Sequence, residues 1–191
     1  MTLVRDAIGQ WVYPIHRLDR GTSGVLLFAL DSGTASVLGE QFAAHSIEKR
    51  YLALVRGVPA EEQWIDHPIP RAEDGPRVPA RTHVRRLFSA AAPLGAARTY
   101  SLVEARPESG RLHQVRRHLK HISHPIIGDV RYGKGEHNRL FRAAYGLHRI
   151  ALHASELCFS HPASGERITL QAPLPADLRE PLERWGLPPQ P

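Results

Sequence analysis

Apolar stretches of strand length follow one another along this chain with few helical segments between them, and this order most constrains the fold. Strands joined without helical crossovers favour antiparallel pairing. We therefore expect an α+β fold, with a mixed, largely antiparallel sheet and a few packed helices. The chain shows neither an internal repeat nor a clean linker, so residues 1–191 are predicted to form a single domain. The predicted strands are residues 25–30, 49–55, 81–88, 98–105, 150–159 and 167–171.

Helices are expected where apolar residues recur at helical spacing. Asp31 is a candidate N-cap for a helix over residues 35–44, and residues 112–122 have an amphipathic pattern. Shorter helices are predicted at 139–145 and 175–185. The apolar run 25–30 is continuous, which predicts a fully buried strand. Two segments are predicted as loops, residues 59–79 with at most a short strand near Trp64, and the small-residue stretch 89–96.

The charge of the chain favours an acidic partner. The formal net charge is +6 and the pI is near 10.0, and nucleic acid is the commonest partner of such a protein. Most of the basic residues are arginine, which suits phosphate contacts and base stacking better than lysine does. No apolar stretch approaches the ~20 residues of a membrane span, and the start lacks the apolar core of a signal peptide. We expect a cytoplasmic protein.

Asp19 lies in an unusual loop, His-Arg-Leu-Asp-Arg-Gly-Thr-Ser-Gly, which spans residues 16–24. Arg17 and Arg20 flank the carboxylate, and two nearby cations favour its ionised form. A structural alternative is equally compatible with the local pattern, because Asp is also common in turns. In that case Asp19 would bridge the arginines or cap the turn that follows.

The segment 110–119 contains an arginine that needs a partner. On a helix, Arg116 lies one turn after Leu112 and just before Leu119, so it flanks the apolar face, whereas Arg117 projects away from it. A charge at the edge of a core is costly without a counter-ion. A solvated helix face explains Arg117 but not Arg116. We therefore predict that Arg116 pairs with Asp19.

These segments resemble motifs of the large ribosomal and tRNA family of pseudouridine synthases. The matches are H-R-L-D-x-x-T-S-G around Asp19, G-R-x-H-Q-x-R ending at Arg116, K-x-Y ending at Tyr51, and L-H-A-x-x-L at 152–157. The resemblance extends over about residues 4–174. It implies that Asp19, Tyr51 and Arg116 form the catalytic set, with Tyr51 against the target base and involved in removing the proton from C5. Without the resemblance, Tyr51 would be interpreted as ordinary strand packing.

The resemblance also implies a function, the isomerisation of a specific uridine in RNA without cofactor or metal. Residues 4–10, 124–129 and 137–139 resemble the tRNA-modifying branch most, which favours a uridine in the tRNA acceptor stem. A ribosomal RNA synthase and a non-catalytic RNA-binding protein on the same fold remain alternatives. Family members generally act alone, so a monomer is expected. The family's usual earlier strand and K-P-x-G loop are not visible ahead of Asp19, so the N-terminal edge strand is expected to be missing.

Substrate contacts are expected from residues in and beside the two motifs. Arg17 would help occupy the space left by a flipped base, by resemblance to a family arginine. The expected substrate-binding residues are His16, Arg17, Arg20, Thr22, Arg111, His113, Gln114 and Arg117. Further basic residues are predicted to follow the phosphate backbone, or else to form an ordinary basic surface, namely Arg71, Arg77, Arg81, Arg85, Arg86 and Lys120.

Other kinds of site fit the sequence poorly. The histidines at positions 113, 118, 121 and 124 have no carboxylate or thiolate to complete a zinc set, and neighbouring cations would repel a metal. His16, Asp19 and Ser23 contain the residue types of a hydrolase triad but lack the G-x-S-x-G turn.

Overall fold

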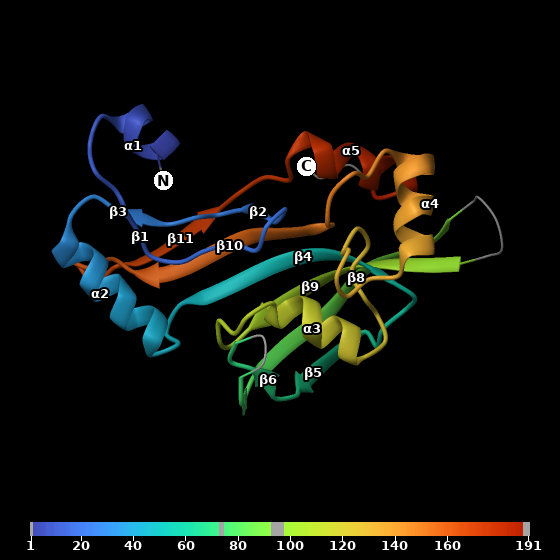
Figure 1. The fold of residues 1–191 in the computed structure, drawn as a ribbon, viewed down its shortest axis with the longest axis horizontal. Coiled ribbons are helices and arrows are strands. Elements are labelled where there is room, and N and C mark those ends of the chain that lie inside the picture. The colour runs from blue at the N-terminus through green and yellow to red at the C-terminus, as the bar shows by residue number, and fades with distance from the viewer. Residues whose placement is uncertain (1, 73–74, 93–97, 189–191) are drawn as a thin grey trace.

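A seven-stranded sheet forms the centre of the computed structural model, which describes residues 2–188 apart from 73–74 and 93–97. The strand order is β11-β10-β4-β9-β8-β5, and every neighbouring pair on this path is antiparallel. The short β2 pairs with β10 in parallel. This arrangement confirms the predicted α+β fold (Figure 1). The strands are β2 (Ser23–Gly24), β4 (Glu48–Arg56), β5 (Glu62–Asp66), β8 (Arg81–Ala92), β9 (Arg98–Pro107), β10 (Leu152–Ser160) and β11 (Arg167–Gln171).

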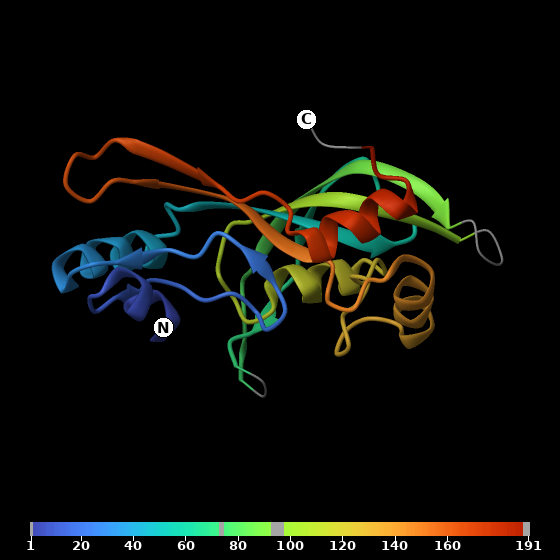
Figure 2. The same cartoon turned by 90° about the horizontal axis from the view of Figure 1, so that it is seen from above.

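Helices α2, α3 and α4 lie on the same face of this sheet (Figure 2). Helix α5 packs against α4, through the contact of Trp185 with Phe141. Two further pairs of short strands lie outside the main sheet, β1 with β3 and β6 with β7. These elements are α1 (Thr2–Ile8), β1 (Tyr13–Pro14), β3 (Phe28–Ala29), α2 (Ser32–Ala43), β6 (Ile69–Pro70), β7 (Arg77–Val78), α3 (Gln114–His121), α4 (Gly135–Tyr145) and α5 (Ala176–Trp185).

The apolar core has two parts. The larger one packs α3, α4 and α5 on β4 and β9, with Leu54, Tyr100 and Phe141 fully buried. The smaller one packs α2 on β10 and β11 around Leu38 and Phe159. Burial of apolar area on this scale is the main term that stabilises the sheet. The larger core also supports α3, which carries Arg116.

The predicted buried strand at 25–30 is wrong. Only Phe28–Ala29 forms a strand, β3, and it pairs with β1. Leu26 is 41% exposed and Leu30 is 58% exposed. The alternate residues Val25 and Leu27 pack against the α2 cluster, so one face of the segment is covered and the other is open. The continuous apolar run predicted a segment buried on both faces, whereas the segment is buried on one face only.

The predicted loop at 89–96 is wrong for its first half. Residues Ser89 to Ala92 continue β8 and pair with the start of β9, as far as Ala92 opposite Arg98. The Ser89 hydroxyl also lies 2.8 Å from that of Ser101. Cross-strand pairing outweighs the weak strand preference of serine and alanine here. Residues 93–96 of this prediction lie outside the described part of the chain.

The loop that carries Asp19 is fastened to β10. The N–H of Val25 donates to the carbonyl of Ala154 at 2.9 Å. The Ser23 hydroxyl donates to Nδ1 of His153 at 2.8 Å, and Nε2 of His153 donates to the Ala172 carbonyl at 2.9 Å. Burial lowers the pKa of His153, which keeps the ring neutral and able to bridge the two partners. Between Ser23 and Val25, Gly24 has φ +121°.

Gly24→Ala tests this attachment. A Cβ at position 24 would lie 2.1 Å from the Ala154 oxygen, and φ there disfavours any side chain. We expect the free energy of unfolding to fall by about 3 kcal/mol in urea denaturation. The control is Gly39→Ala in α2, where a Cβ meets nothing within 4 Å and alanine is expected to stabilise the helix by up to about 1 kcal/mol. Equal effects of the two substitutions would contradict the tight attachment.

Candidate active site

Arg116 joins two carboxylates from distant parts of the chain. Its NH1 lies 3.2 Å from Oδ2 of Asp19, as predicted from the edge position of Arg116 on the helix. Its Nε and NH2 donate to both oxygens of Asp129, at 2.8 and 3.0 Å. The Asp129 side chain is fully buried, and that of Asp19 is 26% exposed. The guanidinium is thus held by a buried acid and presented to a more exposed one.

Asp129 was not identified as a site residue from the sequence. It follows Gly128 in a turn after α3, where its Oδ1 also accepts from the N–H groups of Arg131 and Tyr132, at 2.9 and 3.0 Å. Burial opposes its charge, but these bonds and Arg116 outweigh burial and lower the pKa of Asp129. Likewise, burial disfavours the charge of Arg116, yet both carboxylates together raise its pKa. The signal in the sequence is the segment 124–129, in which Asp129 follows Gly128 and the apolar pair Ile126–Ile127.

A cavity of about 330 Å³ opens beside Asp19. Its walls are the Asp19 loop, the start of β4, the turn 107–111 and the N-terminal end of α3. The volume is within the range of sites that hold a small molecule or a single nucleoside. Of the predicted site residues, it is lined by Arg17, Asp19, Thr22, Tyr51, Arg111, His113 and Gln114.

Tyr51 comes from β4 and lines this cavity with Asp19. Burial, followed by the negative charge of Asp19, raises the pKa of Tyr51 to about 12. The hydroxyl is therefore protonated at neutral pH. In the empty cavity Tyr51 offers a ring face and a hydrogen-bond donor, and it is a poor base.

Lys49 enters the same cavity two residues earlier on β4. Its Nζ donates to the carbonyl of Ser109 at 3.1 Å. Burial lowers the pKa of Lys49 to about 8. The sequence pattern K-x-Y pointed to this lysine, but the prediction of site residues did not include it.

In the described part of the chain, the cations on either side of Asp19 are not its ion-pair partners. Arg17 and Arg20 are exposed, and among the described residues the ion pair of Asp19 is with Arg116. Arg17 does line the cavity, whereas Arg20 does not. The backbone of the loop is bound by Arg149, whose NH2 donates to the Gly21 carbonyl at 2.8 Å.

His16 and Gln114 both make hydrogen bonds within the protein. His16 stacks on Phe42 and its Nε2 accepts from the Leu27 N–H at 3.1 Å, while burial lowers its pKa to about 4. The buried Gln114 amide makes four hydrogen bonds. Its Oε1 accepts from the Ser109 hydroxyl and the Arg111 N–H, and its Nε2 donates to the Arg81 carbonyl and the Thr82 hydroxyl. Both residues support the site. The Gln114 amide is fully hydrogen-bonded within the protein, and His16 does not line the cavity.

The histidines at positions 113, 118, 121 and 124 contact different groups and do not form one cluster. His113 contacts the Tyr132 hydroxyl at 3.0 Å, and His121 stacks on His67 at 3.7 Å. His118 bonds to Thr82 and to the His67 carbonyl, and His124 to the Arg56 carbonyl. Within the described residues, no three His, Cys, Asp or Glu side chains are placed to hold a metal ion. Arg117 projects from α3 over the Tyr132 ring at 5.4 Å, away from the cavity lining.

The chain is similar in sequence to proteins of a known family. The family described as RNA pseudouridylate synthase matches residues 2–121. The chain belongs to this family. Among curated relatives, a tRNA pseudouridine synthase C of Pectobacterium carotovorum is 46% identical over 187 residues, which are 90% of this chain and 50% of that protein. The tRNA pseudouridine synthase C of Vibrio cholerae is 43% identical over 188 residues, 91% of this chain and 77% of that protein.

Solved structures of family members have the same fold. Human RNA pseudouridylate synthase domain containing 4 superposes with a TM-score of 0.75 at 28% identity, covering 96% of this chain and 80% of the human one. Human RNA pseudouridylate synthase domain containing 1 gives 0.73 at 28% identity, covering 90% and 72%. No helix in the described part of this family member is long and apolar enough to cross a membrane.

Asp129→Asn and Asp19→Asn should differ sharply in stability. The first leaves Arg116 buried without its full counter-charge, so we expect the free energy of unfolding to fall by about 3 kcal/mol. The second removes a partly exposed charge bound by one contact, with an expected loss below about 1 kcal/mol. Urea denaturation measures both. A larger loss for Asp19→Asn would mean that Asp129 is not the anchor of Arg116.

The pKa of Lys49 can be measured directly, because the chain has only three lysines. Reductive methylation with carbon-13 gives one NMR signal for each lysine, and the exposed Lys120 and Lys134 serve as comparison. We expect the Lys49 signal to titrate near pH 8, so that its charge is present below this pH and is lost as the pH rises through it. A midpoint above about 10, the ordinary value, would contradict the burial of its ammonium group.

Proposed function

We propose that this chain is a pseudouridine synthase that isomerises a uridine in tRNA. The observation that carries the proposal is the Asp19–Arg116 ion pair at the edge of a cavity of nucleoside size. In the reaction the N1–C1′ bond of the uridine breaks, the uracil turns, and C5 bonds to C1′. The rearrangement is internal and redox-neutral, so no cofactor or metal is part of the proposal.

The uridine must leave its stack to reach Asp19. Flipping a base costs roughly a few kcal/mol. Arg17 is exposed at the cavity and is proposed to fill the space left in the RNA. The side chains of Tyr51 and Leu152 offer the flipped base a ring and an apolar wall. Asp19 then acts on the sugar, either as nucleophile at C1′ or as the base that generates a glycal.

Charge coupling suggests how Tyr51 takes part in the later proton transfer from C5. The charge of Asp19 helps to raise the pKa of Tyr51, after burial. When Asp19 bonds to C1′ or takes up a proton, that charge disappears. The pKa of Tyr51 then falls, and its phenolate becomes easier to form. Tyr51 is thus proposed to reach its phenolate form, the form that can accept the proton from C5, more readily after Asp19 has reacted.

The substrate proposal rests on the relatives and on charge. The relatives described above are named as tRNA pseudouridine synthases, and the net charge of +6 suits a polyanion. We propose a uridine of the acceptor stem as the target, and a monomeric catalytic domain over residues 1–191 that acts in the cytoplasm.

Release of tritium from C5 tests the activity. We expect the chain to release tritium from tRNA transcripts made with uridine tritiated at C5, and Asp19→Asn to lower kcat by roughly a thousandfold or more. The control is Asp6→Asn, an exposed aspartate of α1 outside the cavity lining, which should keep full activity. Release that persists in Asp19→Asn would refute the catalytic assignment. Release from ribosomal RNA alone would refute the tRNA assignment, and RNA binding without any release would favour a binding protein.

A further inference from the structure

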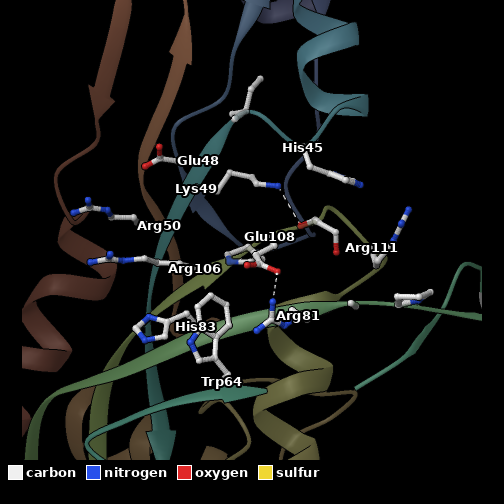
Figure 3. Close-up of a pocket in the computed structure, with 15 residues that line it drawn as sticks. His45, Glu48, Lys49, Arg50, Trp64, Arg81, His83, Arg106, Glu108 and Arg111 are labelled. Atoms are coloured by element: carbon white, nitrogen blue, oxygen red, sulfur yellow. Dashed lines mark hydrogen bonds and ion pairs between the residues drawn. The ribbon is translucent and has the colours of Figure 1, made fainter. Parts of the chain in front are cut away.

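A second groove, of about 800 Å³, adjoins the catalytic cavity and is larger than it. The two share Lys49, Pro107, Ser109 and Arg111 as lining residues, so they meet at this boundary. The groove lies across the start of β4 and the end of β9, with β5 and β8 on its far side (Figure 3). No step proposed above uses it.

An exposed tryptophan lies on the far side of this groove. Trp64 of β5 is 51% exposed, although large aromatic side chains gain from burial. Arg81 lies over its ring at 4.6 Å, and the ring of His83 lies 4.8 Å away at a tilt of 54°. Arg81 is in turn paired with Asp66 and Glu108, each at 3.4 Å. These contacts hold the indole in place, and Trp64 is among the residues that line the groove.

The charges along the groove favour a polyanion. Five lysine or arginine residues line it against two glutamates, Glu48 and Glu108. Both glutamates are already paired, with Arg167 and Arg81. Arg50 and Arg106 also have carboxylate partners, Glu156 and Glu104.

Lys49 and Arg111 differ from the other cations. Among the described residues neither has a carboxylate partner, and Nε of Arg111 is buried without a hydrogen-bond partner. They are also the two cations common to the groove and the catalytic cavity. Figure 3 places Lys49 across the groove from Trp64 and His83, and Arg111 at one side of the groove. An anionic group at the boundary would give both cations the partner that the protein lacks.

We propose that this groove is a subsite for the nucleotide next to the target uridine, which leaves its base pair and its stack together with the flipped uridine. Its base stacks on Trp64, and the phosphate that links it to the flipped uridine binds Lys49 and Arg111. The subsite rests on the proposed function, since a uridine in the cavity sets where the next nucleotide lies. Stacking requires an open π-face, which a base inside a duplex does not offer.

Binding of a short single strand tests the subsite without any turnover. The probe is fluorescein-labelled hexauridylate, measured by anisotropy at one fixed salt concentration. We expect Trp64→Ala to raise the Kd about tenfold and Trp64→Phe to raise it less than about threefold, because phenylalanine still stacks. Trp11→Ala is the matched control, since Trp11 is 56% exposed and lies outside the groove. It should leave the Kd unchanged.

Two further probes separate base stacking from charge. Trp64→Ala should leave the Kd of a hexamer of abasic ribose phosphates and that of a short RNA duplex within about twofold, because neither offers a free base. An equal loss for the abasic hexamer would overturn the stacking role of Trp64. So would an unchanged Kd for hexauridylate, or an equal loss in Trp11→Ala.

Turnover distinguishes failure of the subsite from failure of the proposed function. On tritiated tRNA, Trp64→Ala should raise KM about tenfold with kcat within about twofold, because the indole contacts a neighbour of the reacting nucleotide. Wild-type kinetics in Trp64→Ala would overturn the subsite and leave the proposed function intact. Absence of tritium release from the wild-type chain would overturn the proposed function, and the hexauridylate measurement would still decide whether Trp64 stacks a base.

Discussion

The bidentate ion pair between Arg116 and the fully buried Asp129 is the contact on which the site depends. A buried guanidinium is tolerable only when its charge is matched and its N–H groups are bonded. Asp129 meets this need, and its own oxygens are held by backbone N–H groups of the following turn. The remaining NH1 then faces Asp19 in a fixed direction. The order of attachment therefore runs from the core outward, and the Asp19 carboxylate, the proposed reactive group, is the last and least constrained member.

The polar groups around the cavity also differ in whether they are hydrogen-bonded within the protein. Buried groups that line it, such as Gln114 and its partners, have their hydrogen bonds satisfied within the protein. Two of the cavity residues have a buried polar atom without a partner, namely Nε of Arg111 and the hydroxyl of Thr22. Other such atoms lie outside the cavity lining, on Arg117, Tyr145 and Trp185. A buried polar group without a partner costs stability, and at the two cavity positions a ligand would supply the missing bond.

Much of this could be predicted from the sequence, for physical reasons that differ by residue. The Asp19–Arg116 pair followed from an arginine at the edge of an apolar helix face, a position that is costly without an acid. Asp129 was missed because a buried aspartate in a turn has no periodic signal, and only the three-dimensional fold places it against Arg116. Arg17 and Arg20 flank Asp19 in the sequence but are exposed and do not pair with it, because neighbours along a loop can turn away from one another. The run 25–30 and the stretch 89–92 failed for the same reason, since tertiary pairing and not local composition decided their structure.

The wide separation of the paired residues along the chain has a consequence for synthesis. Asp19 and Arg116 lie 97 positions apart, and the loop that carries Asp19 is attached to β10, at Ala154. Contacts over such distances form late, because closing long loops costs entropy before any contact repays it. A nascent chain that has not yet emerged from the ribosome as far as β10 has the sequence motif but no cavity. Premature termination between the end of α3 and the start of β10 would therefore yield a product that carries Asp19, Tyr51 and Arg116 but lacks the strand to which the Asp19 loop is attached.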